Sequence, residues 1–409
     1  MKKLGLLLIF LLGTFGTSSQ TYAVPGDIAY IGNDNNVYTY DLAAGERHAL
    51  TEDARIYQYP VWSTDGRLAY FCCDTPQLDT QVYISENGIT PGNLVYQTQP
   101  SIFTYAYWSP RNCDTDDTCR DLSVLISQPE GFSAILVRDL ADEATTQIIG
   151  QGSPFYYSWS PDGSQLVTQR NQRQLDIYNI VDDSFQTLAM RPGIFPAPAW
   201  SPVDDRVLFG VLNPETRLTD LMIYAGGTTD VLVEGLSGEV AFNWSPDGNM
   251  IAYRSIDRDG VGELIIIDAI TGEVVTRTQG FQVLSFFWSP DSEKIAFVTI
   301  AQPRGTLNIS YNPQETPLSL VGWSLLEVNS GAIRDYGNFT PTDEMIYVLS
   351  YFNQFAQSHR VWSPDSTHII FSEVLPNNQG EGISILDMTR PDTVPFFIVQ
   401  GVIGIWSYH

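Results

Sequence analysis

Short runs of apolar and aromatic residues follow one another along most of the chain and are separated by polar turns. Typical runs lie at residues 28–31, 68–71, 102–107 and 263–268. Runs of this length that are rich in β-branched and aromatic residues, with Gly, Pro, Asp and Ser between them, are typical of β-strands. The pattern therefore predicts an all-β protein.

A Trp-Ser pair stands at the end of eight of these runs, six times with Pro behind it. The pairs begin at Trp62, Trp108, Trp159, Trp200, Trp244, Trp288, Trp362 and Trp406. Neighbouring pairs are 46, 51, 41, 44, 44, 74 and 44 residues apart. A period near 44 leaves about eleven residues for each of four strands with its turn, which is typical of a β-propeller blade.

The full repeat Trp-Ser-Pro-Asp-Gly, at Trp159 and Trp244, has a structural interpretation. Pro presets the backbone for a tight reversal, Asp tolerates the next turn position, and Gly accepts the left-handed conformation that closes a hairpin. The tryptophan is a large side chain suited to wedge between adjacent blades. We therefore interpret the eight Trp-Ser pairs at these positions as structural anchors.

The extended pattern Trp-Ser-Pro-Asp-Gly-x-x-Ile-Ala-Tyr/Phe resembles the TolB-like, WD40-like propeller repeat (PD40), and the resemblance covers nearly all of the chain after residue 23. It implies a β-propeller of four-stranded antiparallel blades. Propellers of this kind serve as binding platforms, as gating domains of peptidases and as enzymes, so the resemblance does not specify a function. TolB proteins carry an α/β domain before the propeller, whereas blade-like strands begin here directly after residue 23.

The two ends of the chain are predicted to complete one blade between them. Residues 28–31, 37–40 and 46–50 match the second, third and fourth strands of a blade, and residues 402–406 supply a first strand. Pairing them closes the ring and removes two exposed sheet edges. Eight Trp-Ser strands then give eight blades, and seven is the alternative if one divergent repeat forms no blade.

The one long interval, before Trp362, indicates two insertions, near residues 301–318 and 339–360. Both are expected on the face where first strands begin, and long insertions at one rim of a rigid scaffold are where binding usually concentrates. The alternative is a pair of tolerated surface loops. The candidate binding residues in the second insertion are Gln354, Gln357, Ser358, His359 and Arg360.

Residues 1–23 have the pattern of a secretory signal peptide: Lys2 and Lys3, a short apolar run, and a small-residue site ending at Ala23. We expect an exported protein, in the periplasm, at the cell surface or outside the cell, with residues 24–409 as a single propeller domain and no membrane insertion. The formal net charge of −26 excludes nucleic acid as a partner, because phosphate backbones would be repelled.

The four cysteines fall in two pairs. Export makes disulfides plausible, and Cys113 with Cys119 is the expected bridge, across an enlarged turn after Trp108. Cys72 and Cys73 end a second strand, at the opposite face, and are predicted to be either free thiols or a vicinal disulfide.

The sequence offers no recognisable catalytic constellation. Gly-x-Ser-x-Gly is absent, and the histidines, His48, His359, His368 and His409, lack the spacing of metal ligands. No cofactor is expected. Calcium at the aspartates of 114–117 or 257–260 is a minor alternative, because the spacing of a dedicated calcium loop is incomplete.

Two classes of function remain. The favoured one is an exported, monomeric, non-enzymatic propeller that binds an unidentified protein or peptide. The alternative is a glycan-binding protein or carbohydrate-active enzyme with an aromatic-lined channel, in which Tyr105 and Tyr156 are the candidate stacking residues. They belong to a set of tyrosines that precede three successive Trp anchors: Tyr57, Tyr59, Tyr105, Tyr107, Tyr156 and Tyr157.

Overall fold

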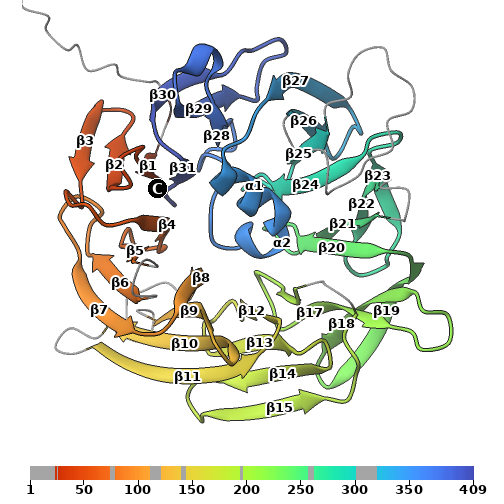
Figure 1. Cartoon of the computed structure of the whole chain (residues 1–409). Helices are drawn as coiled ribbons and strands as arrows, with labels where there is room; N and C mark the ends of the chain where they lie inside the picture. The colour runs from red at the N-terminus through yellow and green to blue at the C-terminus, as the bar shows by residue number, and fades with distance from the viewer. Residues whose placement is uncertain are drawn as a thin grey trace, which may run out of the picture.

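The predicted strands pair with their neighbours along the chain, and the resulting antiparallel sheets stand around a common axis (Figure 1). The computed structural model describes residues 24, 26–73, 79–110, 121–139, 144–193, 197–256, 262–300 and 320–409. Several predictions fall outside these residues: the signal peptide, the Cys113–Cys119 bridge, the insertion at 301–318 and both candidate calcium stretches.

Eight sheets form eight blades, which confirms the all-β propeller and the preferred blade count. Seven blades have four strands, listed here from the channel outward: blade 1, β31 (Ile403–Trp406), β1 (Asp27–Ile31), β2 (Val37–Asp41), β3 (Glu46–Ala49); blade 2, β4 (Tyr57–Trp62), β5 (Leu68–Cys72), β6 (Thr80–Ser85), β7 (Asn93–Thr98); blade 3, β8 (Ile102–Trp108), β9 (Asp121–Gln128), β10 (Gly131–Asp139), β11 (Ala144–Gly152); blade 4, β12 (Phe155–Trp159), β13 (Gln165–Arg170), β14 (Gln174–Asn179), β15 (Ser184–Leu188); blade 5, β16 (Ala199–Trp200), β17 (Val207–Leu212), β18 (Thr219–Ala225), β19 (Thr228–Leu236); blade 6, β20 (Glu239–Trp244), β21 (Met250–Ile256), β22 (Leu264–Asp268), β23 (Val274–Arg277); and blade 7, β24 (Val283–Trp288), β25 (Lys294–Ile300), β26 (Val321–Glu327), β27 (Ile333–Phe339).

Blade 8 has three strands, β28 (His368–Val374), β29 (Glu381–Asp387) and β30 (Phe396–Gln400). Its innermost position is taken by the segment that ends at Trp362, which pairs with Ile369 of β28 through a single bridge. The chain reaches this position from two helices, α1 (Asp343–Ser350) and α2 (Phe352–Phe355), and not from an outer strand of blade 7.

In each blade the outermost strand is the most exposed. Every residue of β5 is buried, whereas four of the five residues of the outer strand β15 are exposed. Inner strands are covered by the neighbouring blades on both faces, so their sequences are almost continuously apolar, while outer strands alternate or are polar.

The repeated turn is closed by its serine and its aspartate. Ser160 Oγ donates to Asp162 (2.6 Å) and accepts from the backbone N–H of Gln165 (2.9 Å). Gly163 then takes a φ of 68°, the left-handed value predicted for the last position. The same serine-to-aspartate bond closes four further turns: Ser63–Asp65, Ser245–Asp247, Ser289–Asp291 and Ser363–Asp365.

In blades 7 and 8 a serine stands where the repeat has glycine. Ser292 and Ser366 both have a φ of 61°, which L-residues rarely adopt. Each hydroxyl accepts a hydrogen bond from the preceding blade, Ser292 from the Asp247 N–H and Ser366 from the Asp291 N–H, both at 3.0 Å. The bond between blades offsets the backbone strain.

The Trp anchors join neighbouring blades through their indole nitrogens. Trp108 Nε1 donates to the carbonyl of Val61 (3.0 Å), the residue before the tryptophan of blade 2. Three further anchors repeat this bond to the previous Trp-bearing strand: Trp159 to Tyr107, Trp244 to Ala199 and Trp362 to Phe287. The tryptophan is therefore both a wedge and a hydrogen-bonded link.

The ring is closed as predicted. β31 pairs antiparallel with β1, with Ile28 opposite Trp406 and Ile31 opposite Ile403. The C-terminal strand thereby becomes the innermost strand of the blade whose other three strands are the first of the chain.

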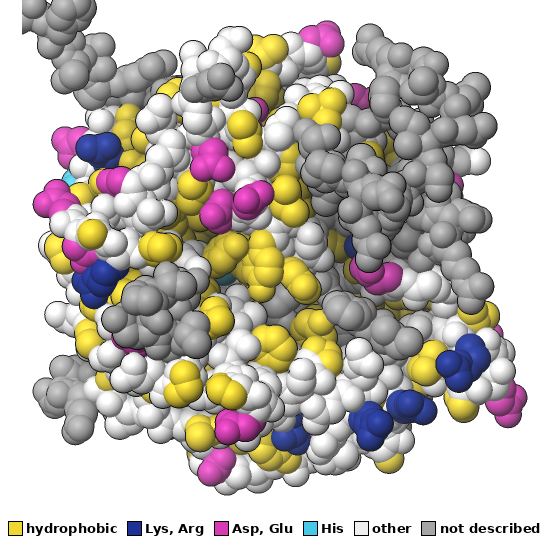
Figure 2. Space-filling view, viewed as in Figure 1, with side chains coloured by type: hydrophobic (Ala, Val, Ile, Leu, Met, Phe, Trp, Pro, Cys, Tyr) yellow, Lys and Arg dark blue, Asp and Glu magenta, His cyan; other side chains and the backbone are white. Residues whose placement is uncertain are grey.

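The insertion at 339–360 differs from the rim loop that we expected. It folds into α1 and α2, which lie in the middle of the ring (Figure 1). Thr342 caps α1 by accepting from the Met345 N–H, and α1 buries Met345, Val348 and Leu349. These residues recur at helical spacing, so one face of the helix packs on the inner strands. On the molecular surface seen in this view, apolar side chains gather at the centre and acidic side chains lie beside them (Figure 2).

Of the two states expected for Cys72 and Cys73, the structure has the vicinal disulfide. Within the described residues, no helix is long and apolar enough to cross a membrane.

Candidate functional site

Helix α2 closes the central channel partway along its length. Tyr105 donates its hydroxyl proton to the carbonyl of Gln354 (3.0 Å), and Gln354 Nε2 donates to the carbonyl of Tyr157 (2.8 Å). Phe355 of α2 packs against two tyrosines, with ring centroids 5.3 Å from Tyr105 and 5.7 Å from Tyr59. We call α1, α2 and the following residues up to Arg360 the plug.

The part of the channel beyond the plug is a cavity of about 310 Å³, which we call the turn-face cavity. Its wall is made by the ends of the innermost strands and the turns that follow them, so it opens at the face opposite α1. Pro202 and Pro246 are exposed at its mouth. Most of the wall is aromatic or proline: Tyr107, Pro110, Trp159, Pro161, Trp200, Pro202, Trp244, Pro246, Phe287, Trp288, Pro290, Trp362 and Tyr408.

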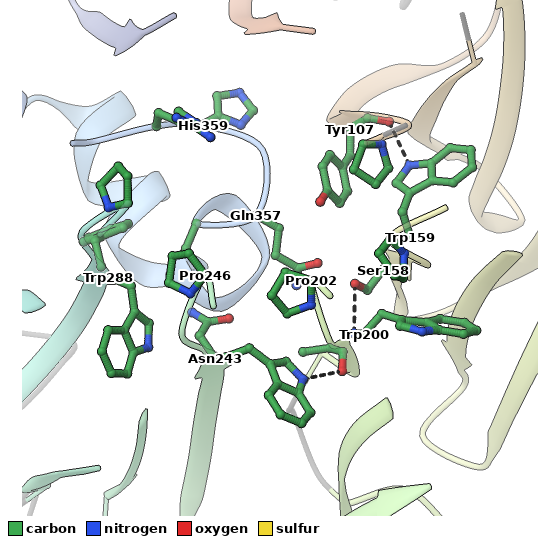
Figure 3. A pocket seen from close by; sticks show the side chains of 18 of the residues that line it. Tyr107, Ser158, Trp159, Trp200, Pro202, Asn243, Pro246, Trp288, Gln357 and His359 are labelled. Carbon is green, nitrogen blue, oxygen red and sulfur yellow. Dashed lines mark hydrogen bonds between the residues drawn. The ribbon is translucent and has the colours of Figure 1, made fainter. Parts of the chain in front are cut away.

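Figure 3 shows how these groups are arranged. Tyr107, Trp159 and Trp200 lie on one side of the cavity, and Trp288 and His359 lie on the other. The proline rings come from the same position of successive repeats, directly after Trp-Ser, which is why they recur around the mouth. The repeat thus places a ring of rigid apolar groups at one end of the channel.

Polar groups in the cavity come from the plug and from the surrounding strands. Gln357 is half-buried, and its Nε2 donates to the carbonyl of Asn353 (3.1 Å). Asn243, with its amide nitrogen turned towards the plug, donates to the same carbonyl (3.3 Å). Ser158 Oγ accepts a hydrogen bond from the backbone N–H of Trp200 (3.2 Å).

Arg360 is the charged group of the cavity. Its guanidinium carbon lies 3.8 Å from the centre of the Tyr408 ring, which also lines the cavity. Among the described residues that line the cavity there is no aspartate or glutamate. In the same part of the chain no carboxylate lies within ion-pairing distance of Arg360.

His359 lines the cavity but is almost completely buried, and burial lowers the pKa of its imidazole to about 3. The ring is therefore neutral at neutral pH. Its Nδ1 lies 2.7 Å from the Ser358 hydroxyl, which is also buried. A buried serine next to a neutral histidine holds the plug together and does not face the cavity as a nucleophile.

The predicted site residues are thus divided between three places. Gln357, His359 and Arg360 line the turn-face cavity. Gln354, Ser358 and Tyr105 are buried within or against the plug, so they are not the exposed polar group that we expected at the rim. Tyr156 lies at the other end of the channel.

Tyr156 lines a smaller pocket of about 210 Å³ on the face that carries α1. Its other walls include Tyr351 from the plug and the ion pair between Arg254 and Glu239 (3.3 Å). Arg254 is buried there, and its Nε and Nη1 atoms have no hydrogen-bond partner among the described residues. Burial lowers the pKa of this guanidinium.

Sequence reasoning missed Asn243, Tyr408 and the prolines as cavity residues. The prolines carried a usable signal, since they occupy one position of a repeat and must therefore lie at one face. Asn243 and Tyr408 carried none. In the described part of the chain, no cluster of three or more His, Cys, Asp or Glu side chains is arranged to hold a metal ion.

The fold and the cavity define an eight-bladed β-propeller with a channel closed at one end. No protein-family model matches the chain. A curated relative, dipeptidyl-peptidase 5 of Porphyromonas gingivalis, is 25% identical over 214 residues. The match takes in 47% of this chain and 28% of that protein, so the chain spans little more than a quarter of the relative's length.

Solved structures share the fold over most of the chain. An oligogalacturonate lyase from Vibrio parahaemolyticus is 14% identical with a TM-score of 0.53, covering 89% of this chain and 99% of its own. A structure described as a eukaryotic initiation factor is 12% identical with a TM-score of 0.55, covering 93% and 98%. TolB from Acinetobacter baumannii is also among the neighbours, at 12% identity, with a TM-score of 0.40 and coverage of 85% and 83%. Identities this low show the propeller fold and leave function to the site.

Proposed function

We propose that this chain is an exported, non-enzymatic β-propeller that binds a peptide segment of a partner protein in the turn-face cavity. The observation that carries the proposal is the wall of this cavity, where tryptophan, tyrosine and proline rings surround a blind space with few polar groups. Rigid aromatic walls bind apolar and proline-containing peptide segments with little loss of side-chain entropy.

Support for export comes from the sequence of residues 1–23, with two lysines ahead of a short apolar run and a small-residue end.

Support for a binding role over a catalytic one comes from the chemistry of the wall. A general acid, base or nucleophile must reach the substrate. Ser358 and His359 are hydrogen-bonded to each other; Ser358 is buried in the plug, and His359, although it lines the cavity, exposes only 1% of its surface. Indole and proline rings supply contact area and no proton transfer.

The test is a peptide array probed with the purified protein and with a variant whose cavity is filled. Gln357→Trp places an indole in the cavity, and we expect at least a tenfold loss of binding to the peptides that the wild type retains. Gln186→Trp, the same substitution on the exposed outer strand β15, is the matched control and should bind normally. Equal binding by both variants would show that the peptides do not bind in the turn-face cavity.

Glycan binding is the second candidate, and the pocket around Tyr156 is the observation that favours it. Two tyrosines beside an arginine, a glutamate and Asn353 are the groups that stack on sugar rings and bond to hydroxyls. A glycan array probed in parallel separates the two candidates. Binding that is lost in Tyr156→Ala and kept in Gln357→Trp would favour the glycan function and count against the peptide function.

A further inference from the structure

We propose that the turn-face cavity takes the carboxyl end of a polypeptide, with the terminal carboxylate bound by Arg360 and the last side chains packed among the Trp and Pro rings. This inference rests on the proposed function and specifies which part of a partner enters the cavity.

Charge favours an anionic group in this cavity. The whole chain carries a formal charge of −26, so most of its surface repels anions. Inside the cavity the balance is reversed, because Arg360 is the charged residue among the described lining residues and His359 is neutral. The cavity therefore favours a negatively charged group that is small enough to enter it, away from the acidic outer surface of the protein. A terminal carboxylate fits that description.

The Arg360 guanidinium is oriented to bind a carboxylate. One face of Arg360 lies against the ring of Tyr408, which fixes the plane of the group. Stacking leaves the N–H edge of a guanidinium free for two parallel hydrogen bonds to a carboxylate. In the part of the chain that the structure describes, no carboxylate occupies this edge as an ion-pair partner. Arg360 is half-buried, so a ligand can reach it and binds it in a partly dehydrated site.

The closed end of the cavity favours the end of a chain over its middle. Hydrogen bonds from Tyr105 and Gln354 anchor the plug across the channel, so a chain cannot pass through it. A cavity of about 310 Å³ is at the small end of the range for ligand sites, about 300–1,000 Å³. It admits the last residues of a chain and excludes a folded surface. A blind cavity with a cation in its wall selects a carboxyl end over an amino end.

The experiment compares two arrays of the same hexapeptides, anchored through their N-termini, one set with free carboxyl ends and the other amidated. Apolar and aromatic final residues are varied on both arrays. We expect at least tenfold tighter binding to the free acids, as charge-assisted bidentate hydrogen bonds require. The selected peptides are then measured in solution by fluorescence anisotropy at two salt concentrations.

Arg360→Met and Arg360→Lys are the decisive variants. Arg360→Met should bind acid and amide forms alike, at the level of the wild type with the amide, while Arg360→Lys should keep part of the preference. Arg390→Met, on an exposed arginine of the loop after β29, is the matched control and should behave as wild type. Circular dichroism of each variant establishes that it is folded.

The outcomes separate this inference from the function on which it rests. Equal wild-type binding to both arrays, lost in Gln357→Trp, would overturn the carboxylate inference and leave the peptide function standing. Binding to neither array would overturn both. Binding of an acidic oligosaccharide that depends on Arg360, with no peptide bound, would keep the anion site and reject a polypeptide as its occupant.

Discussion

At the scale of the residue, Trp anchors that occupy the same position of the repeat differ in whether their indole N–H is hydrogen-bonded. Trp108 donates to the carbonyl of Val61 across the blade boundary, while the buried indole nitrogen of Trp62 has no hydrogen-bond partner in the part of the chain that the structure describes. Both rings fill the same place in the repeat and are almost fully buried. Their replacement by phenylalanine therefore removes a similar volume but a different number of hydrogen bonds.

We predict that Trp108→Phe lowers the free energy of unfolding more than Trp62→Phe does, by about 1–3 kcal/mol. Loss of the Trp108 bond leaves a buried carbonyl oxygen with one partner fewer, whereas Trp62→Phe removes a donor that had none. Chemical denaturation of the two variants beside the wild type measures the difference. Equal destabilisation would mean that the tryptophans act by volume alone.

The chemistry of the repeated turn could be derived from the sequence, because all of its partners lie within five residues. Ser160, Asp162 and Gly163 behave as the local rules require. Ser292 could not be explained in this way. Its left-handed backbone is compensated by a bond to Asp247 in the neighbouring blade, and no rule of sequence spacing identifies that partner.

At the scale of the element, the plug decides what the channel can do. α2 is one turn long and would not be stable alone. It is held by inner strands and by α1, since Phe355 contacts Tyr59 of β4, Tyr105 of β8 and Tyr347 of α1 at ring-centroid distances of 5.3–5.7 Å. A short helix with few backbone bonds of its own is thus fixed by aromatic packing.

We predict that Phe355→Ala costs about 3–5 kcal/mol of stability, the usual cost of removing a buried phenylalanine. Tyr351→Ala, four residues earlier and 38% exposed, should cost far less. Guanidinium denaturation measures both, and limited proteolysis between residues 343 and 360 reports whether the plug is released. A Phe355→Ala protein within 1 kcal/mol of wild type would contradict the packing described here.

The plug was the main element that sequence reasoning did not find. Residues 339–360 were expected as a loop because they interrupt a regular series of strands. Their helical signal was present: Thr342 followed by Asp343 and Glu344, and then apolar residues at 345, 348, 349 and 352. A run this short gives a weak period. Its place inside the channel could not be inferred, because that depends on the ring's inner diameter.

At the scale of the whole molecule, the same acid-dependent contact recurs around the ring. Burial alone would raise the pKa of Asp162, Asp247 and Asp365. The hydrogen bonds that each accepts from its turn serine and from nearby groups outweigh burial and hold the pKa below its usual value. A carboxyl group with a lowered pKa in the folded state stabilises the fold above its unfolded pKa, and that contribution is lost as the pH falls through the folded pKa.

We predict that the triple variant with Asn at positions 162, 247 and 365 melts roughly a few degrees below wild type at pH 7. The gap should close as the pH falls below about 4, where the wild-type carboxylates also become protonated. Thermal unfolding between pH 7 and pH 2.5 measures the gap. Asn at the exposed positions 182, 205 and 230 gives a control with the same change of charge, and a gap independent of pH would reject the explanation.

The closure of the ring also determines when the first blade can be completed during synthesis of the chain. β1, β2 and β3 are made first, yet the strand that completes their blade is β31. Until residue 406 has been synthesised, Ile28 and its neighbours in β1 lack their pairing partner. The incomplete ring then has an unpaired strand edge at each end. Any chaperone, protease or secretion machinery that binds the chain before then encounters an open propeller with its first blade incomplete. The time between the first blade and the last strand is the period in which this protein is vulnerable.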